Sequence, residues 1–378
     1  FLKMTGQYFI IGGTGFHEID NTPILDDATV DKLNEIYEWM KIYYYEDFDK
    51  ADIQGALLDG LIGGLEDPYS VYYTKEEYKD LMVSTSGEYY GIGAGLQQDA
   101  TTMEVTITKV YKGTPAEEAG LRENDVITAV GDVSMYQMTT QDAVSYIRGE
   151  EGTTVTLTIY RPSEQEYIDI TVERRRVESP TVNYEMMGEI GYLQITSFDE
   201  VTVDQFDAAY KALEEAGMKG LIIDVRSNPG GLLTSVLGIS RQILPKGLIV
   251  YTEDKYGQKN EYSCDGANEI DIPLVVLING NSASASEILA GAVQDYGIGT
   301  IVGKTTYGKG VVQNIFALND GSAVKLTISN YFTPNGNNIH GIGIIPDVEV
   351  ELDVDKYYDE DVDTQIEKAI EVLQEQIN

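Results

Sequence analysis

The feature that most constrains this chain is a strand-length apolar run that leads through small polar residues into a helical pattern. The run covers residues 273–278, Asn279 to Ala283 follow, and the helical pattern begins near residue 284. Such a junction presents a side chain at the edge of a sheet, and the free N–H groups of the first helical turn point toward it. A serine there has the exposure and the nearby donors that an acyl-transfer nucleophile needs.

Strand-like and helix-like segments alternate from about residue 181 onward. Strands are expected at 190–195, 221–225, 248–252, 274–278 and 300–303, and helices from 202, at 232–244, 284–296 and 361–373. Thr202-Val-Asp-Gln205 predicts a capping box at the start of the first of these helices. This alternation indicates a largely parallel sheet covered by helices, and therefore an α/β core.

Charge and residue counts exclude several kinds of partner. The 378 residues carry 26 Lys+Arg against 63 Asp+Glu, a formal net charge of −37, which repels phosphate backbones and makes nucleic acid an unsuitable partner. The single cysteine, Cys264, rules out an intrachain disulfide. The only histidines are His17 and His340, without a zinc-binding pattern around them, which argues against a histidine-based zinc site. An acyl-transfer serine of the kind described above needs no metal and no cofactor, so we expect neither. His340 lies in a glycine-bounded turn and is interpreted as a surface residue.

The N-terminal part is expected to comprise an extension at 1–26 and a helical region at 27–87. Apolar residues at helical spacing over 27–47 and 53–61 predict amphipathic helices, which either pack on the main body or form a dimerisation arm. The chain begins at Phe1 without an initiator methionine, and residues 9–12 are a short apolar segment. We therefore expect an export signal or membrane anchor ahead of residue 1 and an extracytoplasmic, secreted or envelope-anchored protein of bacterial type.

Residues 88–175 have a different character, with short strands and glycine-rich turns. Alternation predicts strands at 105–110, 125–130 and 154–160, and a short helix at 140–147. The segment Gly113-Thr-Pro-Ala-Glu-Glu-Ala-Gly-Leu-Arg-Glu-Asn-Asp-Val-Ile127 resembles the hallmark of a bacterial permuted PDZ domain, with Asn124 in place of a common glycine. PDZ domains bind a peptide as an added strand. The resemblance implies that Gly91, Ile92, Gly93 and Ala94 form the loop that holds the peptide's terminal carboxylate.

A serine nucleophile needs a base, and with so few histidines the candidates are Lys, Asp and Glu. Lys309 lies between two glycines in Thr305-Thr-Tyr-Gly-Lys-Gly-Val-Val-Gln313, so the backbone can close around it. In an extended segment Gln313 lies on the same face as Lys309 and can hold it in place. As a base, a lysine must be neutral, which requires burial to lower its pKa from ~10.4 by ~2–3, at a cost of roughly 3–4 kcal/mol.

Several motifs in order resemble the carboxyl-terminal processing peptidases, also called tail-specific proteases. They are Asp224-Val-Arg-Ser-Asn-Pro-Gly-Gly-Leu-Leu233, Asn281-Ser-Ala-Ser-Ala-Ser-Glu-Ile288, the segment 303–313, Tyr331-Phe-Thr-Pro-Asn-Gly336 and Gly343-Ile-Ile-Pro-Asp-Val348. The resemblance implies that Ser284 is the nucleophile, Lys309 the general base and Gln313 its orienting partner. It also implies an oxyanion hole from the N–H groups of Gly230 and Ala285.

Neighbouring residues receive other interpretations. Ser282 and Ser286 are rivals for the nucleophile, and Ser282 is expected to help cap the helix. Glu287 is interpreted as structural or helix-dipole support, with a supporting catalytic role as the alternative. Lys304 is expected at the surface.

The resemblance implies a multidomain α/β protein with a crotonase/ClpP-like protease core at 176–378 and an inserted, mostly β PDZ domain at 88–175. The implied function is a serine endopeptidase that cleaves proteins near their C-termini, with the PDZ domain selecting the tail and gating activity. Its partners are protein or peptide substrates with free tails, and a second copy if the N-terminal helices pair. A membrane contact would require an anchor ahead of residue 1. Two alternatives are a catalytically silent PDZ scaffold and, more remotely, an enzyme acting on acyl thioesters.

Overall fold

The computed structural model describes residues 3–4, 7–8 and 22–377. The predicted N-terminal extension, including His17 and residues 9–12, lies largely outside the described residues. The chain divides into two compact units. Unit 1 contains the described residues up to Thr74 together with 253–259 and 313–328, and unit 2 contains 75–252, 260–312 and the described residues from 329 onward.

Unit 1 is built from the N-terminal helices and a β-hairpin from the C-terminal part of the chain. Helix α1 (Asp27–Tyr43) and helix α2 (Lys50–Gly63) begin at Asp26 and Asp49, whose side chains accept hydrogen bonds from N–H groups of the first turn. Neither helix contains a buried residue. The other elements are β1 (Lys3–Met4), β2 (Gln7–Tyr8), β3 (Val71–Tyr73) and most of the hairpin of β19 (Val311–Ala317) and β20 (Ala323–Phe332), in which β3 pairs with the start of β20.

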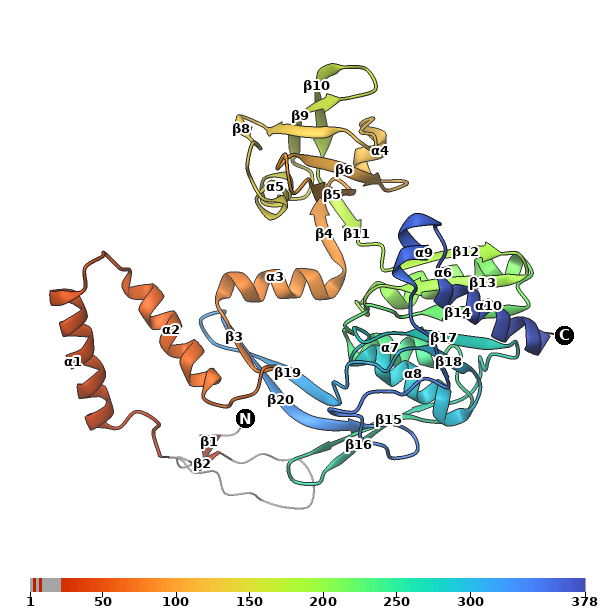
Figure 1. The fold of residues 1–378 in the computed structure, drawn as a ribbon. Coiled ribbons are helices and arrows are strands. Elements are labelled where there is room, and N and C mark those ends of the chain that lie inside the picture. The colour runs from red at the N-terminus through yellow and green to blue at the C-terminus, as the bar shows by residue number, and fades with distance from the viewer. Residues whose placement is uncertain (1–2, 5–6, 9–21, 378) are drawn as a thin grey trace. The chain divides into compact units, whose positions relative to one another are not determined.

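In unit 2, strand β4 (Glu88–Gly91) lies at the start of the segment that resembles a PDZ domain, and strand β11 (Arg175–Glu178) lies at its end. The two strands pair with each other as an antiparallel ribbon (Figure 1). The sheet inside this segment has the order β10-β9-β7-β6-β5, with β8 paired to β7. Its elements follow α3 (Lys75–Ser86) and are β5 (Ala94–Gln98), β6 (Val105–Val110), α4 (Pro115–Glu118), β7 (Val126–Val130), β8 (Val133–Ser134), α5 (Thr140–Ile147), β9 (Thr154–Arg161) and β10 (Glu166–Glu173). Ile107, Leu157 and Ile159 lie fully buried at its centre.

The α/β core of unit 2 is a six-stranded sheet of order β12-β13-β14-β17-β18-β21, parallel from β13 onward and antiparallel at β12. Its strands β14 and β17 are buried along their whole length, as expected for a parallel sheet covered on both faces. The strands are β12 (Val182–Met187), β13 (Ile190–Ile195), β14 (Gly220–Asp224), β17 (Leu274–Ile278), β18 (Thr300–Gly303) and β21 (Val348–Glu349).

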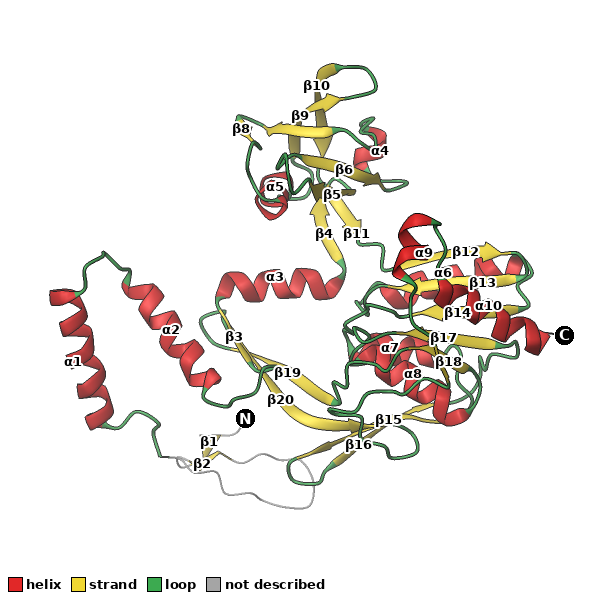
Figure 2. Cartoon of the chain, viewed as in Figure 1, coloured by secondary structure: helices red, strands yellow, loops and turns green. Residues whose placement is uncertain are grey.

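Helices cover the two faces of this sheet unequally (Figure 2). One face packs on α6 (Thr202–Glu215), α7 (Leu233–Ser240) and α8 (Ala285–Tyr296), and the other packs on α10 (Thr364–Ile377). Successive side chains along β17 point to opposite faces of the sheet. Val276 therefore packs with the residues of α6, α7 and α8, and Val275 and Leu277 pack with the residues of α10. Strands β15 (Gly247–Asp254) and β16 (Lys259–Cys264) extend from β20 in a second sheet, and α9 (Val354–Asp359) precedes α10.

The predicted capping box at the start of α6 is wrong. Thr202 lies inside the helix, and its hydroxyl accepts a hydrogen bond from the Asp199 N–H at 2.9 Å. The Gln205 side chain instead accepts from the Thr181 N–H at 2.9 Å. The Thr202 hydroxyl also contacts the Thr181 hydroxyl at 2.8 Å, so both side chains that the local pattern paired with each other contact Thr181, a residue outside the helix. Predicted helix bounds also shift, since α7 ends at Ser240 rather than 244, and α10 covers Thr364–Ile377 rather than 361–373.

Candidate active site

Ser284 lies between the carboxyl end of β17 and the first residue of α8, at the junction the sequence indicated. Its backbone has φ 55° and ψ −111°, a left-handed φ that a residue with a side chain adopts only under constraint. A sharp, strained strand-to-helix turn is a known way to hold a nucleophilic serine exposed above a sheet. Ser284 is partly exposed.

The two rival serines are fully buried and have structural partners. The Ser282 hydroxyl donates to the Val225 carbonyl at 2.8 Å and accepts from the Asn279 N–H at 3.0 Å. The expectation that Ser282 caps the helix is therefore wrong, because it joins the ends of two strands. The Ser286 hydroxyl donates to the Asn228 carbonyl at 2.9 Å. Of the three serines, only Ser284 is accessible to a substrate.

Glu287 organises the site from inside α8. Its side chain is fully buried and accepts four hydrogen bonds. Oε1 accepts from the Thr306 hydroxyl at 2.5 Å and the Gly308 N–H at 2.7 Å. Oε2 accepts from the Ser284 N–H at 2.7 Å and the Lys309 N–H at 2.9 Å. The structure thus brings the backbones of Ser284 and Lys309 together through one carboxylate, a tertiary role that the helix position of Glu287 did not reveal.

The glycines beside Lys309 let another segment of backbone pack directly against its loop. A Cβ on Gly308 would lie 3.0 Å from the N atoms of Ile342 and Gly343, and a Cβ on Gly310 would lie 2.5 Å from the His340 N atom. The Gly341 N–H also donates to the Gly308 carbonyl at 2.8 Å. Lys309 is partly buried in this tight loop.

The structure also shows the surroundings of His340, Lys304 and Gln313. The side chain of His340 is exposed, as expected. Lys304 pairs with Glu349 at 2.9 Å and Glu351 at 2.7 Å at the surface, and hydrogen bonds to these carboxylates raise its pKa. Gln313 belongs to unit 1, where its Nε2 donates to the Thr327 hydroxyl at 3.2 Å, so its role toward Lys309 stays a prediction.

The two predicted oxyanion donors differ in their present partners. Gly230 lies against the serine, because a Cβ on it would be 2.8 Å from the Ser284 Cβ and 2.9 Å from the Ala285 N atom. Its N–H, however, donates to Oδ1 of the buried Asn228 at 2.8 Å. Ala285 opens α8, and within the described part of the chain its N–H has no hydrogen-bond acceptor. One donor is therefore available and the other is bound within its own turn.

An ionic network lies at the end of β14, just before the Asn-Pro-Gly-Gly turn that contains Gly230. The Arg226 guanidinium contacts Asp224 at 2.6 Å and Asp363 at 2.8 Å. Burial alone lowers the pKa of Arg226, but the hydrogen bonds and charges of these carboxylates outweigh it and the pKa rises. The Tyr192 hydroxyl also donates to Asp224 at 2.8 Å, and burial followed by the charge of Asp224 raises the pKa of Tyr192. This network ties the start of α10 to the strand that leads into the site.

The predicted carboxylate loop of the PDZ segment is tightly packed. Gly91 ends β4, Ile92 is buried, and Ala94 begins β5. Gly93 has φ 81°, and its carbonyl accepts from the Tyr111 N–H and the Thr114 hydroxyl, both at 3.1 Å. Strand β5 is the last strand of its sheet and packs beside α5, which is the arrangement that an added peptide strand requires.

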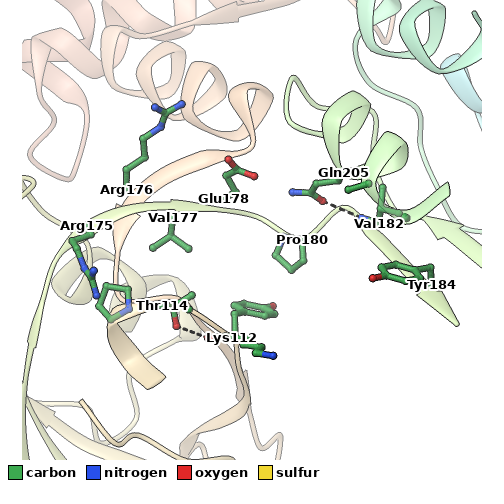
Figure 3. A pocket seen from close by; sticks show the side chains of 15 residues that line it. Lys112, Thr114, Arg175, Arg176, Val177, Glu178, Pro180, Val182, Tyr184 and Gln205 are labelled. Atoms are coloured by element: carbon green, nitrogen blue, oxygen red, sulfur yellow. Dashed lines mark hydrogen bonds between the residues drawn. The ribbon is translucent and has the colours of Figure 1, made fainter. Parts of the chain in front are cut away.

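A cavity of about 500 Å³ lies in unit 2. Figure 3 shows the side chains that line it. Its lining comes from the turn before α4, from β11, and from β12 and α6, and includes Lys112, Thr114, Val177, Pro180 and Gln205. None of the residues assigned to catalysis lines it. No helix in the described part of the chain is both long and apolar enough to cross a membrane.

Comparison with known proteins connects this geometry to a family. Residues 189–350 match the model of peptidase family S41, residues 106–161 match a PDZ domain, and residues 16–77 match the activating protease CtpB N-terminal domain. The carboxy-terminal processing protease CtpA of Bacillus subtilis (strain 168) is 37% identical over 384 residues, which cover 98% of this chain and 80% of that protein.

Two other similarities agree. A probable CtpA-like serine protease of Staphylococcus aureus (strain N315) is 37% identical over 336 residues, 88% of this chain and 66% of that relative, so the chain spans just under two thirds of its length. The solved structure of a putative S41 protease from Bacteroides fragilis NCTC 9343 shares the fold, with a TM-score of 0.54, 17% identity and coverage of 88% and 92%. The expected α/β protease core with a PDZ domain is confirmed. The chain belongs to peptidase family S41, the carboxyl-terminal processing peptidases.

Proposed function

We propose that this chain is a serine endopeptidase that cleaves proteins near their C-termini, with Ser284 as nucleophile and Lys309 as general base. The observation that carries the proposal is the bonding of Ser284 and Lys309, through their N–H groups, to one oxygen of the buried Glu287. The Lys309 backbone is thereby held close to the strained serine turn, which supports the proposal because a serine needs a neighbouring base to become an activated nucleophile. Membership of family S41 supports the same chemistry.

In the proposed mechanism, Ser284 Oγ attacks the scissile carbonyl carbon while the neutral Lys309 amine takes the hydroxyl proton. The oxyanion accepts hydrogen bonds from the Ala285 N–H and, once it is released from Asn228, from the Gly230 N–H. Lys309 then protonates the leaving amine as the peptide bond breaks. Lys309, neutral again, takes a proton from the water that attacks the acyl carbon. It passes this proton to Ser284 Oγ as the ester bond breaks, which restores the serine and the neutral lysine. Gln313 orients Lys309 in this scheme.

The PDZ segment is proposed to select the substrate. A free C-terminal tail adds as a strand along β5, and its carboxylate binds backbone N–H groups of the loop from Gly91 to Ala94. Occupancy of this peptide site gates cleavage. We expect a tail that ends in an amide to be cut more slowly than the same tail with a free carboxylate.

The N-terminal helices are proposed to pair two copies of the chain. Helix α1 exposes Ile36, Trp39 and Tyr43, which are 50%, 55% and 70% accessible. Exposed apolar side chains of this size are typical of an interaction surface. An extracytoplasmic site of action, secreted or at the cell envelope, also belongs to the proposal. Sedimentation of the wild type and of Trp39→Glu tests the pairing.

The experiment that tests the activity compares wild type, Ser284→Ala and Lys309→Ala on a protein extract, followed by mapping of newly formed C-termini. The control Ser84→Ala removes an exposed hydroxyl from α3. We expect new C-termini with wild type and Ser84→Ala and none with the other two, while all four unfold at similar temperatures. Full activity of Ser284→Ala would overturn the proposal. Wild-type protein that stays inert toward every tailed substrate would favour the silent scaffold instead.

A further inference from the structure

Tyr331, on β20, lies in the core directly behind Ser284. Its side chain is 1% exposed, and its hydroxyl donates to the Ser284 carbonyl at 3.1 Å. The Tyr331 backbone N–H donates to the Gly310 carbonyl at 3.0 Å, next to Lys309. One residue therefore contacts both the strained serine turn and the loop of the predicted base. The segment Tyr331-Phe-Thr-Pro-Asn-Gly336, which contains this residue, takes no part in the proposed proton transfers or in the proposed oxyanion hole.

The carbonyl that Tyr331 binds belongs to the same peptide group as the Ala285 N–H. All described peptide bonds are trans, and in a planar trans peptide the C=O and N–H bonds point in opposite directions. Whatever fixes the direction of the Ser284 carbonyl therefore also fixes the direction of the Ala285 N–H. That N–H is the proposed oxyanion donor that has no acceptor within the described residues.

The Ser284 carbonyl also accepts from the Glu287 N–H at 2.9 Å and the Ile288 N–H at 3.0 Å, as the first carbonyl of α8. These two donors come from the helix itself and move with it. The Tyr331 hydroxyl is a donor from a different element, and it ties the peptide plane to β20. Burial, followed by the negative charge of Glu287, raises the pKa of Tyr331 well above its usual value, so the hydroxyl keeps its proton and remains a donor.

We propose that Tyr331 is a positioning residue for the oxyanion hole, which aims the Ala285 N–H by holding the Ser284 carbonyl on the opposite side of the same peptide plane. The inference rests on the proposed function. Its chemical consequence is specific, because an oxyanion donor stabilises the transition state and contributes little to substrate binding. Loss of the Tyr331 hydroxyl should therefore lower kcat and leave KM nearly unchanged.

The test is Tyr331→Phe, which removes only the hydroxyl. The matched control is Tyr296→Phe, at the C-terminal end of α8. The Tyr296 hydroxyl also donates to a backbone carbonyl, that of Leu248, at 2.9 Å. A peptide substrate with a C-terminal tail is used, well below the unfolding temperatures of all variants. We expect kcat of Tyr331→Phe to fall by roughly tenfold or more, about 1.4 kcal/mol in activation free energy, with KM within twofold. Tyr296→Phe should keep kcat within twofold of wild type.

A second measurement separates aiming from a general structural role. A peptide boronate places a tetrahedral, negatively charged group on Ser284 and depends on the oxyanion donors, so its Ki should rise in parallel with the loss of kcat. Binding of a non-cleaved tail peptide should not change. If Tyr331→Phe does not fold, 4-aminophenylalanine and 4-methylphenylalanine at position 331 replace the comparison. The first keeps a donor and should retain kcat within about threefold, and the second fills the space without one and should not.

The outcomes are distinguishable from failure of the proposed function. If wild type cleaves and Ser284→Ala does not, the proposed function stands. A Tyr331→Phe enzyme with kcat and boronate Ki within twofold of wild type then overturns the inference alone. A Tyr331→Phe enzyme whose loss appears in KM with kcat retained also overturns it. If wild type and Ser284→Ala behave alike, the proposed function falls and the inference falls with it.

Discussion

The N–H groups of Ser284 and Lys309 donate to the same atom, Oε2 of Glu287, at 2.7 and 2.9 Å. A shared acceptor fixes the two backbones relative to each other more closely than two independent contacts would. The carboxylate is fully buried and accepts four hydrogen bonds. The geometry of the predicted dyad therefore depends on a residue that does not take part in proton transfer.

Glu287→Gln should disrupt this arrangement. The substitution replaces one carboxylate oxygen with an NH₂ group, which is a donor and would face the N–H and O–H donors that this oxygen now accepts from. It also removes the negative charge that strengthens all four hydrogen bonds. Hydrogen bonds to a charged group contribute about 1.5–3 kcal/mol each, so we expect the free energy of unfolding to fall by about 3 kcal/mol or more and cleavage to be lost. Urea denaturation measures the first effect. Glu215→Gln, on the exposed face of α6, is the control and should change stability by less than about 0.5 kcal/mol. A Glu287→Gln protein as stable as wild type would contradict the role assigned to the carboxylate.

Gly230→Ala should abolish cleavage. Gly230 has φ 102°, and a Cβ would lie 2.7 Å from the Ala283 carbonyl oxygen and 2.8 Å from the Ser284 Cβ. Displacement of the serine turn or of the Gly230 N–H should reduce kcat/KM by at least about 100-fold. Gly188→Ala, in the turn after β12, is the control, because its φ is also positive at 68° but nothing lies within 4 Å of its added Cβ. We expect Gly188→Ala to lose about 1 kcal/mol of stability and no activity. Equal activity of the two variants would show that the contact with Ser284 is unimportant.

The strained backbone at Ser284 predicts that inactive variants at this position differ in stability according to whether they carry a Cβ. Its φ of 55° disfavours any residue with a Cβ but suits glycine. Ser284→Gly and Ser284→Ala should both be inactive, yet Ser284→Gly should unfold with a free energy about 1 kcal/mol higher than Ser284→Ala. Thermal or urea unfolding of the pair decides this. Ser282→Ala, which breaks two buried hydrogen bonds, should lose about 1–3 kcal/mol and serves as the comparison within the same turn. If Ser284→Gly is the less stable of the two, the turn is not strained.

Arg226→Met should destabilise the core far more than removal of a surface pair. Asp224 is fully buried, and without Arg226 its charge would lack its main partner. Breaking a buried ion pair from one side typically costs about 3–5 kcal/mol. Arg122→Met removes the exposed pair with Glu164, whose side chains are 58% and 41% accessible, and should cost less than about 1 kcal/mol. Hydrogen exchange of α10 gives a second measurement, because Arg226 also contacts Asp363 at its start. Equal stability losses in the two variants would contradict this assignment.

Asp199→Asn should change how stability depends on pH. Burial raises the pKa of Asp199, while a hydrogen bond from Ser197 partly opposes the shift. The folded protein thus holds this proton more tightly than the unfolded chain, so the stability it contributes is lost as pH rises through the raised pKa. Relative to wild type, Asp199→Asn should gain stability between acidic and neutral pH, by less than about 1 kcal/mol because the group is only half buried.

The control for the pH experiment is Asp142, whose pKa is lowered by hydrogen bonds from the side chain and backbone of Thr139. Its contribution has the opposite sign, because it is present at neutral pH and lost as pH falls through the lowered pKa. Asp142→Asn should therefore be least stable relative to wild type near neutral pH. The same slope in both variants would contradict the assigned shifts.

The α/β class and the junction at Ser284 could be predicted from the residues alone, because periodicity and glycine, proline and serine patterns act over a few residues and need no distant partner. The PDZ segment and the order of the motifs followed from resemblance to known families. The same local signals misassigned Thr202 and Ser282. Both side chains have hydrogen-bond partners outside the turn in which they lie, Ser197 for Thr202 and Val225 for Ser282.

The surroundings of the serine could not be predicted from the sequence, because they form only when the chain folds. Ser284 differs from Ser286 because folding buries one hydroxyl on Asn228 and leaves the other accessible. Glu287 and Tyr331 acquire their roles because β17, α8, β20 and the loop of Lys309 converge, although these segments are separated along the chain. Hydrogen bonds between distant segments depend on where the folded backbone places each donor and acceptor, and no periodicity within one segment encodes that placement.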